Sequence, residues 1–352
     1  MNSDIFYFSA TGNTENSVKL IAKDIEEAGQ IVNIVRLSGK TSPPEKIADR
    51  VILAFPTLAW RPPALIMRFI RRLPKVKPGE KKFAYVLAVA GGGAKGAPKV
   101  AAKKLAKKGY KIALCESVNY ADNWVQMMSA PDKEQKKKKN AIGANETKNV
   151  IPKILNSEEI KKISLSFPEK LINIIGLLFA LIGRRFLGKL FIADSDCNKC
   201  GLCKRACPVG AIVIKEGKKS RPWWRFNCES CNRCINICPV NAVNSSIPRA
   251  LILILFTTLF IIAGIIGYDK LAGLYVESLP GWLFTATYIA AVIALLFITH
   301  ILSFGVLDMI LLRPLQGLGA VRKFLEKSYT KKFRRYTFDG YKPPNELTKS
   351  KV

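Results

Sequence analysis

The first 128 residues alternate short apolar runs with longer segments in which apolar residues recur every three or four positions. Short apolar runs rich in β-branched and aromatic residues predict buried strands, and the helical spacing of Val18, Ile21, Ala22 and Ile25 predicts an amphipathic helix. We expect strands at residues 5–8 (IFYF), Ile31–Arg36, Arg50–Phe55, Lys82–Ala90 and Tyr110–Val118, with further helices at Pro63–Arg72 and Ala94–Lys108. Repeated strand-then-helix order predicts an α/β fold, a doubly wound parallel sheet with ligands at the carboxyl ends of its strands.

The C-terminal third has a different pattern, with two long apolar runs. Ala250–Gly267 holds 18 residues without a charge, and Trp282–Phe304 holds 23 residues whose one ionisable side chain is His300. As a helix the first run would be about 27 Å long, close to the ~30 Å hydrocarbon core of a bilayer. The alternative is a helical hairpin buried in a large soluble domain, but the sequence shows no domain to bury it. We therefore predict transmembrane helices at 250–267 and 282–304, joined by an external loop at 268–281.

A third apolar segment, residues 169–192, includes Arg184 and Arg185. Its unbroken apolar part, Leu171–Gly183, is too short to span a bilayer. We expect an in-plane interfacial helix over 169–189, or a helix packed between two domains. The preceding residues 129–168 are polar and include Lys136–Lys139, which predicts an exposed basic connector or a solvated helix face.

The net charge of the chain is strongly positive, with 56 Lys and Arg against 26 Asp and Glu, or +30. Such a charge indicates an anionic neighbour. From Arg313 onward there are 11 basic and 3 acidic residues, and short basic segments stay on the cytoplasmic side of a membrane. We expect both termini, including a basic tail at 305–352, to face the cytoplasm beside anionic membrane lipid. Nucleic acid is disfavoured because the basic residues are dispersed and no recognition motif accompanies them.

The N-terminus, MNSDIFYFSATGNT, has no basic stretch before an apolar run, so we do not read it as a cleaved signal peptide. This segment should therefore lie in the reducing cytosol. Cys115 stands alone inside an apolar run and is expected to be a buried core thiol. A single histidine excludes metal sites that need several imidazoles.

Eight cysteines lie in two copies of C-x2-C-x2-C-x3-C-P, from Cys197 to Pro208 and from Cys228 to Pro239. Three closely spaced thiolates can ligate three corners of a cubane cluster, and the fourth iron needs a ligand from elsewhere. The pattern is similar to that of bacterial ferredoxins, in which the fourth cysteine of each run ligates the other cluster. The resemblance implies one [4Fe-4S] cluster on Cys197, Cys200, Cys203 and Cys238, and a second on Cys228, Cys231, Cys234 and Cys207. The alternative is a pair of zinc ribbons, in which this duplicated spacing followed by proline is rare.

A loop of small polar residues precedes the first predicted helix: Ser9, Ala10, Thr11, Gly12, Asn13 and Thr14. Free backbone N–H groups, the helix dipole and several hydroxyls would bind a dianionic phosphate there. The alternative is an ordinary capped turn between strand and helix. The chain has no G-x-G-x-x-G in this loop for dinucleotides and no G-K-[ST] for triphosphates.

This loop resembles the [S/T]-x-T-G-x-T loop of flavodoxins, which holds the FMN phosphate. The resemblance implies strand order 2-1-3-4-5 and two flavin-flanking loops, at Pro56–Pro63 and Ala90–Gly96. Trp60 would stack on the flavin ring, although a surface tryptophan is an equal alternative. The expected contacts are Pro56, Thr57, Leu58, Ala59 and Trp60 in the first loop, Gly91, Gly92 and Gly93 in the second, and further contributions from Asn119, Tyr120, Asn123 and Trp124. The second loop lacks the acidic or aromatic residue that flavodoxins often use there.

The whole chain resembles the flavodoxin–ferredoxin fusion family over roughly 3–128 and 190–246. The resemblance implies an α+β bicluster ferredoxin domain after the flavodoxin-like domain. We expect a membrane-anchored protein that passes electrons between FMN, two [4Fe-4S] clusters and a redox partner protein or a quinone. No general base, nucleophile or small-molecule substrate stands out. The alternative function is a non-catalytic accessory or redox-sensing subunit whose flavodoxin-like domain docks without flavin. His300 and Asp308 are either functional intramembrane groups or polar anchors.

Overall fold

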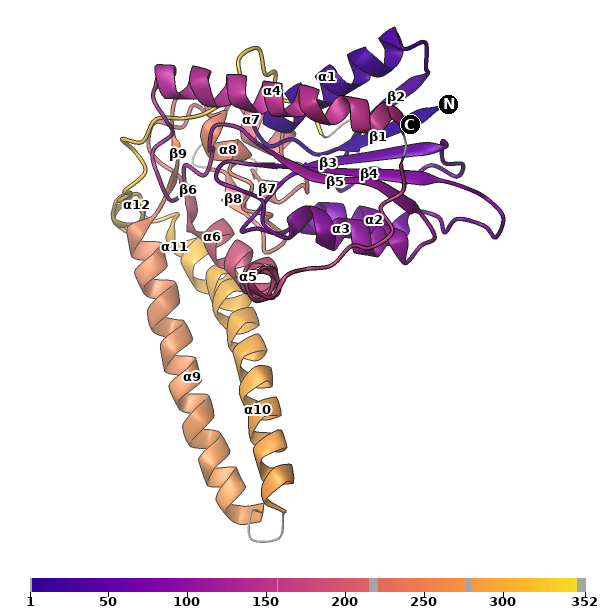
Figure 1. Ribbon diagram of the computed structural model, residues 1–352. Coiled ribbons are helices and arrows are strands. Elements are labelled where there is room, and N and C mark those ends of the chain that lie inside the picture. The colour runs from indigo at the N-terminus through magenta and orange to yellow at the C-terminus, as the bar shows by residue number, and fades with distance from the viewer. Residues whose placement is uncertain (1, 157, 215–220, 276–279, 347–352) are drawn as a thin grey trace.

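The computed structural model describes residues 2–156, 158–214, 221–275 and 280–346, and its N-terminal part is built on a five-stranded parallel sheet (Figure 1). The strands are β1 (Ser3–Tyr7), β2 (Val32–Arg36), β3 (Arg50–Pro56), β4 (Phe83–Ala90) and β5 (Lys111–Asn119). Their order across the sheet is β2-β1-β3-β4-β5, all pairs parallel. This is the flavodoxin-like order, so the predicted fold is confirmed and each strand lies where the apolar runs indicated.

Helices cover both faces of the sheet. Side chains alternate along each strand, so Phe6 and Phe8 pack with α2 (Ala64–Arg72) and α3 (Ala97–Ala106) on one face. Ile5 and Tyr7 pack on the other face with α1 (Asn13–Glu27) and α4 (Lys133–Asn156). A strand buried on both sides has no polar face. This explains the continuous apolar runs of β3 and β4, which are buried along almost their whole length.

Residues 129–168 were interpreted as an exposed basic connector or a solvated helix face, and over residues 133–156 the structure has the helix α4. Its Val150, Ile151 and Ile154 are buried against the sheet, and the backbone at Gly143 lies so close to Tyr120 that a Cβ there would be 2.4 Å from its ring. The flavodoxin-like domain therefore continues to the end of α4. The polar composition, including exposed Lys137–Lys139, reflects the outer face of a helix that buries only a narrow stripe.

The cysteine-rich part consists of two similar halves related by a shift of 31 residues (228 − 197). β6 (Phe191–Ala193) pairs with β9 (Val243–Ser245), and β7 (Ile212–Val213) pairs with β8 (Trp223–Trp224). A short helix follows in each half, α7 (Leu202–Arg205) and α8 (Arg233–Asn236). Each two-stranded sheet combines one strand from each half, so neither half could form such a sheet alone.

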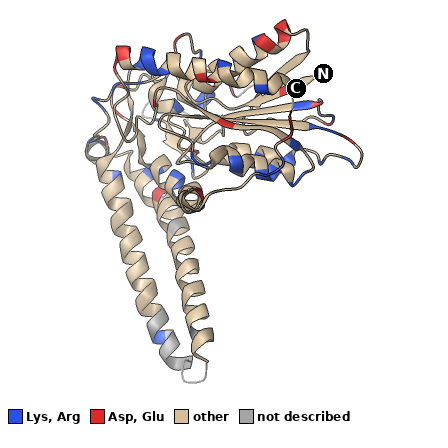
Figure 2. Cartoon of the chain, viewed as in Figure 1, with Lys and Arg blue, Asp and Glu red and all other residues tan. Residues whose placement is uncertain are grey.

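Three apolar helical segments are long and apolar enough to cross a membrane, by length and composition. The first comprises α5 (Phe167–Leu178), the π-helical turn η1 (Phe179–Gly183) and α6 (Arg184–Leu190). The others are α9 (Ile247–Tyr275) and α10 (Gly281–Ile301), which continues through η3 (Leu302–Leu312) and α11 (Arg313–Leu315). α9 and α10 project together from the two domains, whereas α5 is viewed nearly along its axis and so runs across their direction (Figure 1). Charged residues are concentrated in the domains and are sparse along α9 and α10 (Figure 2).

A buried ionic cluster joins the base of these helices. Asp308 of η3 is fully buried and forms ion pairs with Lys189 of α6, at 2.7 Å, and with Arg249 at the start of α9. The two cations also donate to backbone carbonyls, Lys189 to Trp224 at 3.0 Å and Arg249 to Lys189 at 2.7 Å. Asp308 is therefore a structural ion-pair centre. The side chain of His300, on α10, lies outside the part of the chain that the structure describes.

The chain beyond α11 was predicted as a basic tail, and part of it packs across both domains. After α12 (Gly319–Leu325), Thr330 and Tyr336 are buried. Phe338 N donates to Thr11 O at 2.7 Å, and Tyr341 Oη donates to Ala10 O at 3.0 Å. This segment, residues 328–346, therefore connects the loop Ser9–Thr14, which we call the phosphate-type loop, to the cysteine-rich part.

Candidate functional site: two cysteine clusters and an adjoining cavity

The structure gathers the eight cysteines of the two runs into two groups, each with members from both runs. Cys197, Cys200, Cys203 and Cys238 line one hollow. Cys207, Cys228, Cys231 and Cys234 line a second, and Cys203 lies in the wall between the two. The fourth cysteine of each run thus lies with the first three of the other run. This is the crossed grouping that the ferredoxin resemblance implies.

Crowding and burial make these thiols costly to ionise without a cation. Burial, together with the neighbouring Cys197, Cys238 and Cys200, raises the pKa of Cys203 to about 12. Burial likewise raises the pKa of Cys231 to about 11, opposed by the nearby Arg233 guanidinium. Metal ions reverse the preference for the protonated thiol, because a thiol that coordinates a metal is deprotonated outright. Four thiolates at each hollow therefore fit a cationic iron core.

The cubane assignment rests on the two cysteine runs and on their crossed grouping. In a cubane each of the four thiolates ligates a different iron. The thiols that we assign as remote ligands also accept equivalent backbone hydrogen bonds, from Ala211 N to Cys207 Sγ at 3.2 Å and from Ala242 N to Cys238 Sγ at 3.3 Å.

A cavity of about 280 Å³ opens at the carboxyl ends of β1, β3, β4 and β5. The sequence-predicted residues that line it are Ser9, Ala10, Thr11, Asn13, Thr14, Pro56, Thr57, Leu58, Ala59, Trp60, Gly91, Gly92, Gly93, Asn123 and Trp124. Gly12, the N-cap residue before α1, has a φ of +112°, and a Cβ there would lie 2.5 Å from Phe338 Cβ. Asn119 and Tyr120 do not line the cavity. Asn119 Oδ1 instead accepts from Gly93 N at 3.0 Å, and the buried Tyr120 hydroxyl accepts from Ser17 at 3.1 Å.

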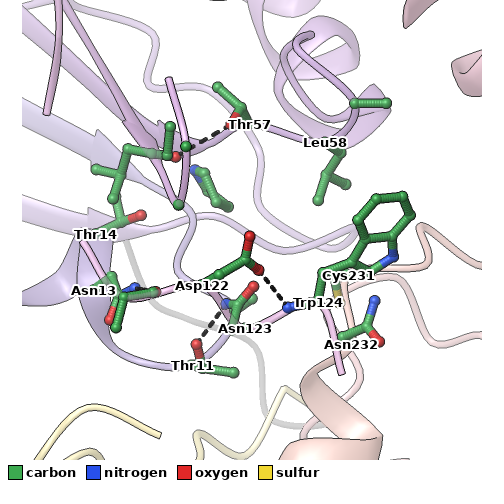
Figure 3. Close-up of a pocket in the computed structure, with 18 of the residues that line it drawn as sticks. Thr11, Asn13, Thr14, Thr57, Leu58, Asp122, Asn123, Trp124, Cys231 and Asn232 are labelled. Atoms are coloured by element: carbon green, nitrogen blue, oxygen red, sulfur yellow. Dashed lines mark hydrogen bonds between the residues drawn. The ribbon is translucent and has the colours of Figure 1, made fainter. Parts of the chain in front are cut away.

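The first turn of α1 carries a buried hydroxyl that has no partner among the described residues. Thr14 Oγ1 is buried and forms no hydrogen bond within the part of the chain that the structure describes. Its neighbours are satisfied: Asn123 donates to Thr11 Oγ1 at 2.6 Å (Figure 3), and Gly12 N donates to Ser9 Oγ at 3.1 Å. A phosphate bound in the cavity at the N-terminus of α1 could accept a hydrogen bond from this unpaired hydroxyl.

The turn that carries Trp60 is strained and is held by α5. Ala59 and Trp60 have φ values of +47° and +58°, and Leu58 and Arg61 exchange backbone hydrogen bonds at 2.9 and 3.2 Å. A Cβ on Gly176 of α5 would lie 2.7 Å from Ala59 O, so this glycine allows the helix to pack directly on the turn. Left-handed backbone at two non-glycine residues persists only where its surroundings impose it, and it concentrates at ligand sites.

Sequence reasoning missed several lining residues. Asp122 places its carboxylate at the cavity, where Oδ1 accepts from Trp124 N at 2.7 Å (Figure 3). A Cβ on Gly91 would lie 2.6 Å from that carboxylate, so the glycine permits its approach. Asp122 therefore brings an acidic side chain to the cavity beside the glycine loop. Met128 and Phe179, from beyond the predicted loops, also line the cavity.

The cavity borders the second cysteine group directly. Ser230, Cys231 and Asn232 line it, and Cys231 also lines the hollow of the second group. The adjacent Arg233 is fully buried and donates to Ser9 O at 2.5 Å and Ala10 O at 3.0 Å. It also donates to Ala206 O at 2.6 Å and pairs with Glu346 at 3.0 Å. One side chain therefore fixes the phosphate-type loop against both cysteine runs, and no local pattern could have indicated it.

Comparisons with known proteins found one matching family model and several similar solved structures. The model of a 4Fe-4S dicluster domain matches residues 189–239, which contain all eight cysteines and imply two [4Fe-4S] clusters. The chain is similar to a flavodoxin from the domain Archaea (16% identity, 43% of this chain and 99% of that chain, TM-score 0.29). It is also similar to the flavodoxin of Megasphaera elsdenii (21% identity, 41% and 98%, TM-score 0.29). No curated protein matches the chain. The flavodoxin-like assignment itself rests on the sheet order, and a 4Fe-4S dicluster domain follows it.

Proposed function

We propose that the chain is a membrane-anchored electron-transfer protein that holds FMN and two [4Fe-4S] clusters in a fixed series. The observation that carries this proposal is the shared position of Cys231, which lines both the cavity at the sheet and the hollow of the second cysteine group. A cofactor in the cavity would be separated from the second cluster by little more than this side chain. When bound, FMN would allow a two-electron transfer on one side to be coupled to one-electron transfers on the other.

Different residues around the cavity would bind different parts of FMN. The loop Ser9–Thr14 and the N-terminus of α1 would bind the phosphate, with Thr14 Oγ1 as an unused donor. Trp60 and Trp124 would contact the ring, while Gly91–Gly93 allow backbone to approach its edge. Asp122 would place negative charge beside the ring and so disfavour an anionic reduced form. Electrons would then pass through the buried second cluster to the more exposed first cluster, or in reverse.

The apolar helices support attachment to a membrane. α9 and α10 would span it as a hairpin, with both termini and both redox domains in the cytoplasm by the distribution of Lys and Arg. α5 would lie along the interface, because Phe167, Leu171, Ile174 and Leu178 are exposed while Gly176 packs against the domain. Buried Arg184 and Lys189 tie the same helical segment to the cysteine-rich part.

The decisive experiment is redox titration of the anaerobically purified full-length protein, with flavin and iron counted. We expect flavin absorbance near 450 nm, about eight irons per chain, and cluster EPR signals broadened by coupling between neighbouring centres. Intact clusters without flavin would refute the FMN assignment and favour the accessory or redox-sensing alternative. Protein that stays soluble without detergent would refute membrane attachment.

A further inference from the structure

The two cysteine groups differ sharply in exposure. The thiols of the second group are buried or half-buried, and the flavodoxin-like domain covers them: Gly39 N donates to Pro208 O at 2.7 Å, and the buried Glu229 accepts from Ala64 N at 3.0 Å and Arg68 at 2.9 Å. In the first group Cys200 is exposed, and Pro239 and Val240 beside it are exposed as well. The first cluster is therefore the centre that an outside protein can approach.

Cationic side chains surround this exposed edge, and two of them, Arg205 and Arg221, are held to it by hydrogen bonds. Arg205 donates to Cys200 O at 2.8 Å, and Arg221 donates to Cys197 O at 3.0 Å. Lys199 precedes Cys200 and is exposed, and Lys204 lies one turn further. The nearby acids Asp194 and Asp196 both pair with Lys331, at 2.5 and 2.7 Å. The surface around the first cluster therefore carries net positive charge around a small apolar patch.

We propose that this surface, formed by Lys199, Lys204, Arg205, Arg221, Pro239 and Val240, docks an acidic, soluble one-electron carrier protein. Fixed cations around an exposed redox centre raise the encounter rate of an anionic partner and orient it. The apolar patch at Val240 allows close approach without the cost of desolvating charges. This inference deepens the proposed function by naming its partner, and it needs the clusters but not the flavin.

An anionic bilayer is the other partner that a basic surface could meet, and the fold disfavours it. The hairpin α9–α10 leaves the domains on one side, whereas α7, which carries Cys203 and Lys204, lies beyond α6 on the side away from the hairpin (Figure 1). With the hairpin in a membrane, the first cluster would face the cytosol. A soluble partner could then reach it without displacing α5 or α6.

The test compares two charge-reversed variants that have the same net charge. Lys199→Glu/Lys204→Glu alters the proposed surface, and Lys104→Glu/Lys107→Glu alters two exposed positions at the C-terminal end of α3, Lys107 being the residue that follows the helix. Each variant lowers the net charge from +30 to +26, because two substitutions change it by two units each. The probe is an acidic two-cluster ferredoxin, and its association rate with detergent-solubilised protein is measured at 20 and 200 mM salt. EPR of the reduced clusters shows that they survive in every sample.

We expect the first variant to associate about tenfold more slowly than the unaltered protein and to lose most of its salt dependence. The α3 variant should remain within about twofold of the unaltered protein. Equal slowing in both variants, or salt-independent association of the unaltered protein, would overturn the proposal. Quenching of a fluorophore on Val240→Cys by brominated lipid in proteoliposomes would identify the surface as a membrane contact instead, and would also overturn it. Loss of the cluster EPR signals from the unaltered protein would refute the proposed function itself, which separates the two failures.

Discussion

The unpaired hydroxyl of Thr14 gives a sharp test of the phosphate loop. Thr14→Val keeps the shape of the side chain and removes only the hydroxyl, which has no partner within the described protein. A hydrogen bond to a charged group contributes about 1.5–3 kcal/mol, so the FMN dissociation constant should rise about 10- to 150-fold. The apoprotein should be no less stable, because the substitution removes a buried polar atom that nothing satisfies.

The matched control is Thr147→Val, also a buried threonine. Its hydroxyl donates to Gly143 O at 2.7 Å and contacts Ser17 Oγ at 2.9 Å and Tyr120 Oη at 3.2 Å. That substitution should lower the stability of the apoprotein by about 1–3 kcal/mol and leave FMN affinity nearly unchanged. Fluorescence titration of apoprotein with FMN and thermal unfolding measure the two quantities separately. If Thr14→Val binds FMN as tightly as the unaltered protein, the phosphate does not occupy this loop.

Three further predictions follow from particular contacts. Cys207→Ala should remove the EPR signal of the cluster held mainly by the second cysteine run, and Cys238→Ala should remove the signal of the cluster held mainly by the first run. If each substitution instead removes the cluster of its own run, the crossed ligation is wrong. Asp308→Asn should destabilise the protein in detergent by about 3–5 kcal/mol, measured by thermal unfolding, because Lys189 and Arg249 lose their shared counterion; an unchanged midpoint would show that the cluster contributes little. Burial raises the pKa of Cys115 to about 12, so at pH 8 its thiolate fraction is far below that of an unfolded chain and iodoacetamide should modify it only after denaturation. Because unfolding lowers this pKa towards 9.0, the thiol should also destabilise the fold as pH rises from about 9 to 12, an effect that Cys115→Ala should abolish.

Much of the fold could be predicted because its signals are local. The continuous apolar runs of the strands, the helical spacing at Val18–Ile25 and the two cysteine runs each lie within a few residues of chain. The apolar segments of α9 and α10 are recognisable for the same reason. The pattern of α4 left a connector and a solvated helix face both open, because a helix that buries one narrow stripe under an otherwise polar surface gives a weak pattern.

The sequence alone determined the doubly wound sheet, the cysteine spacing and the phosphate-type loop, since each depends on neighbouring residues. Only the tertiary structure decided how these parts meet. It placed Cys231 in the wall of the cavity, brought Asp122 beside Gly91 and made Arg233 the link between Ser9 and Ala206. Arg233 and Ser9 are 224 residues apart, and no local pattern can encode a contact that exists only once two domains have packed together.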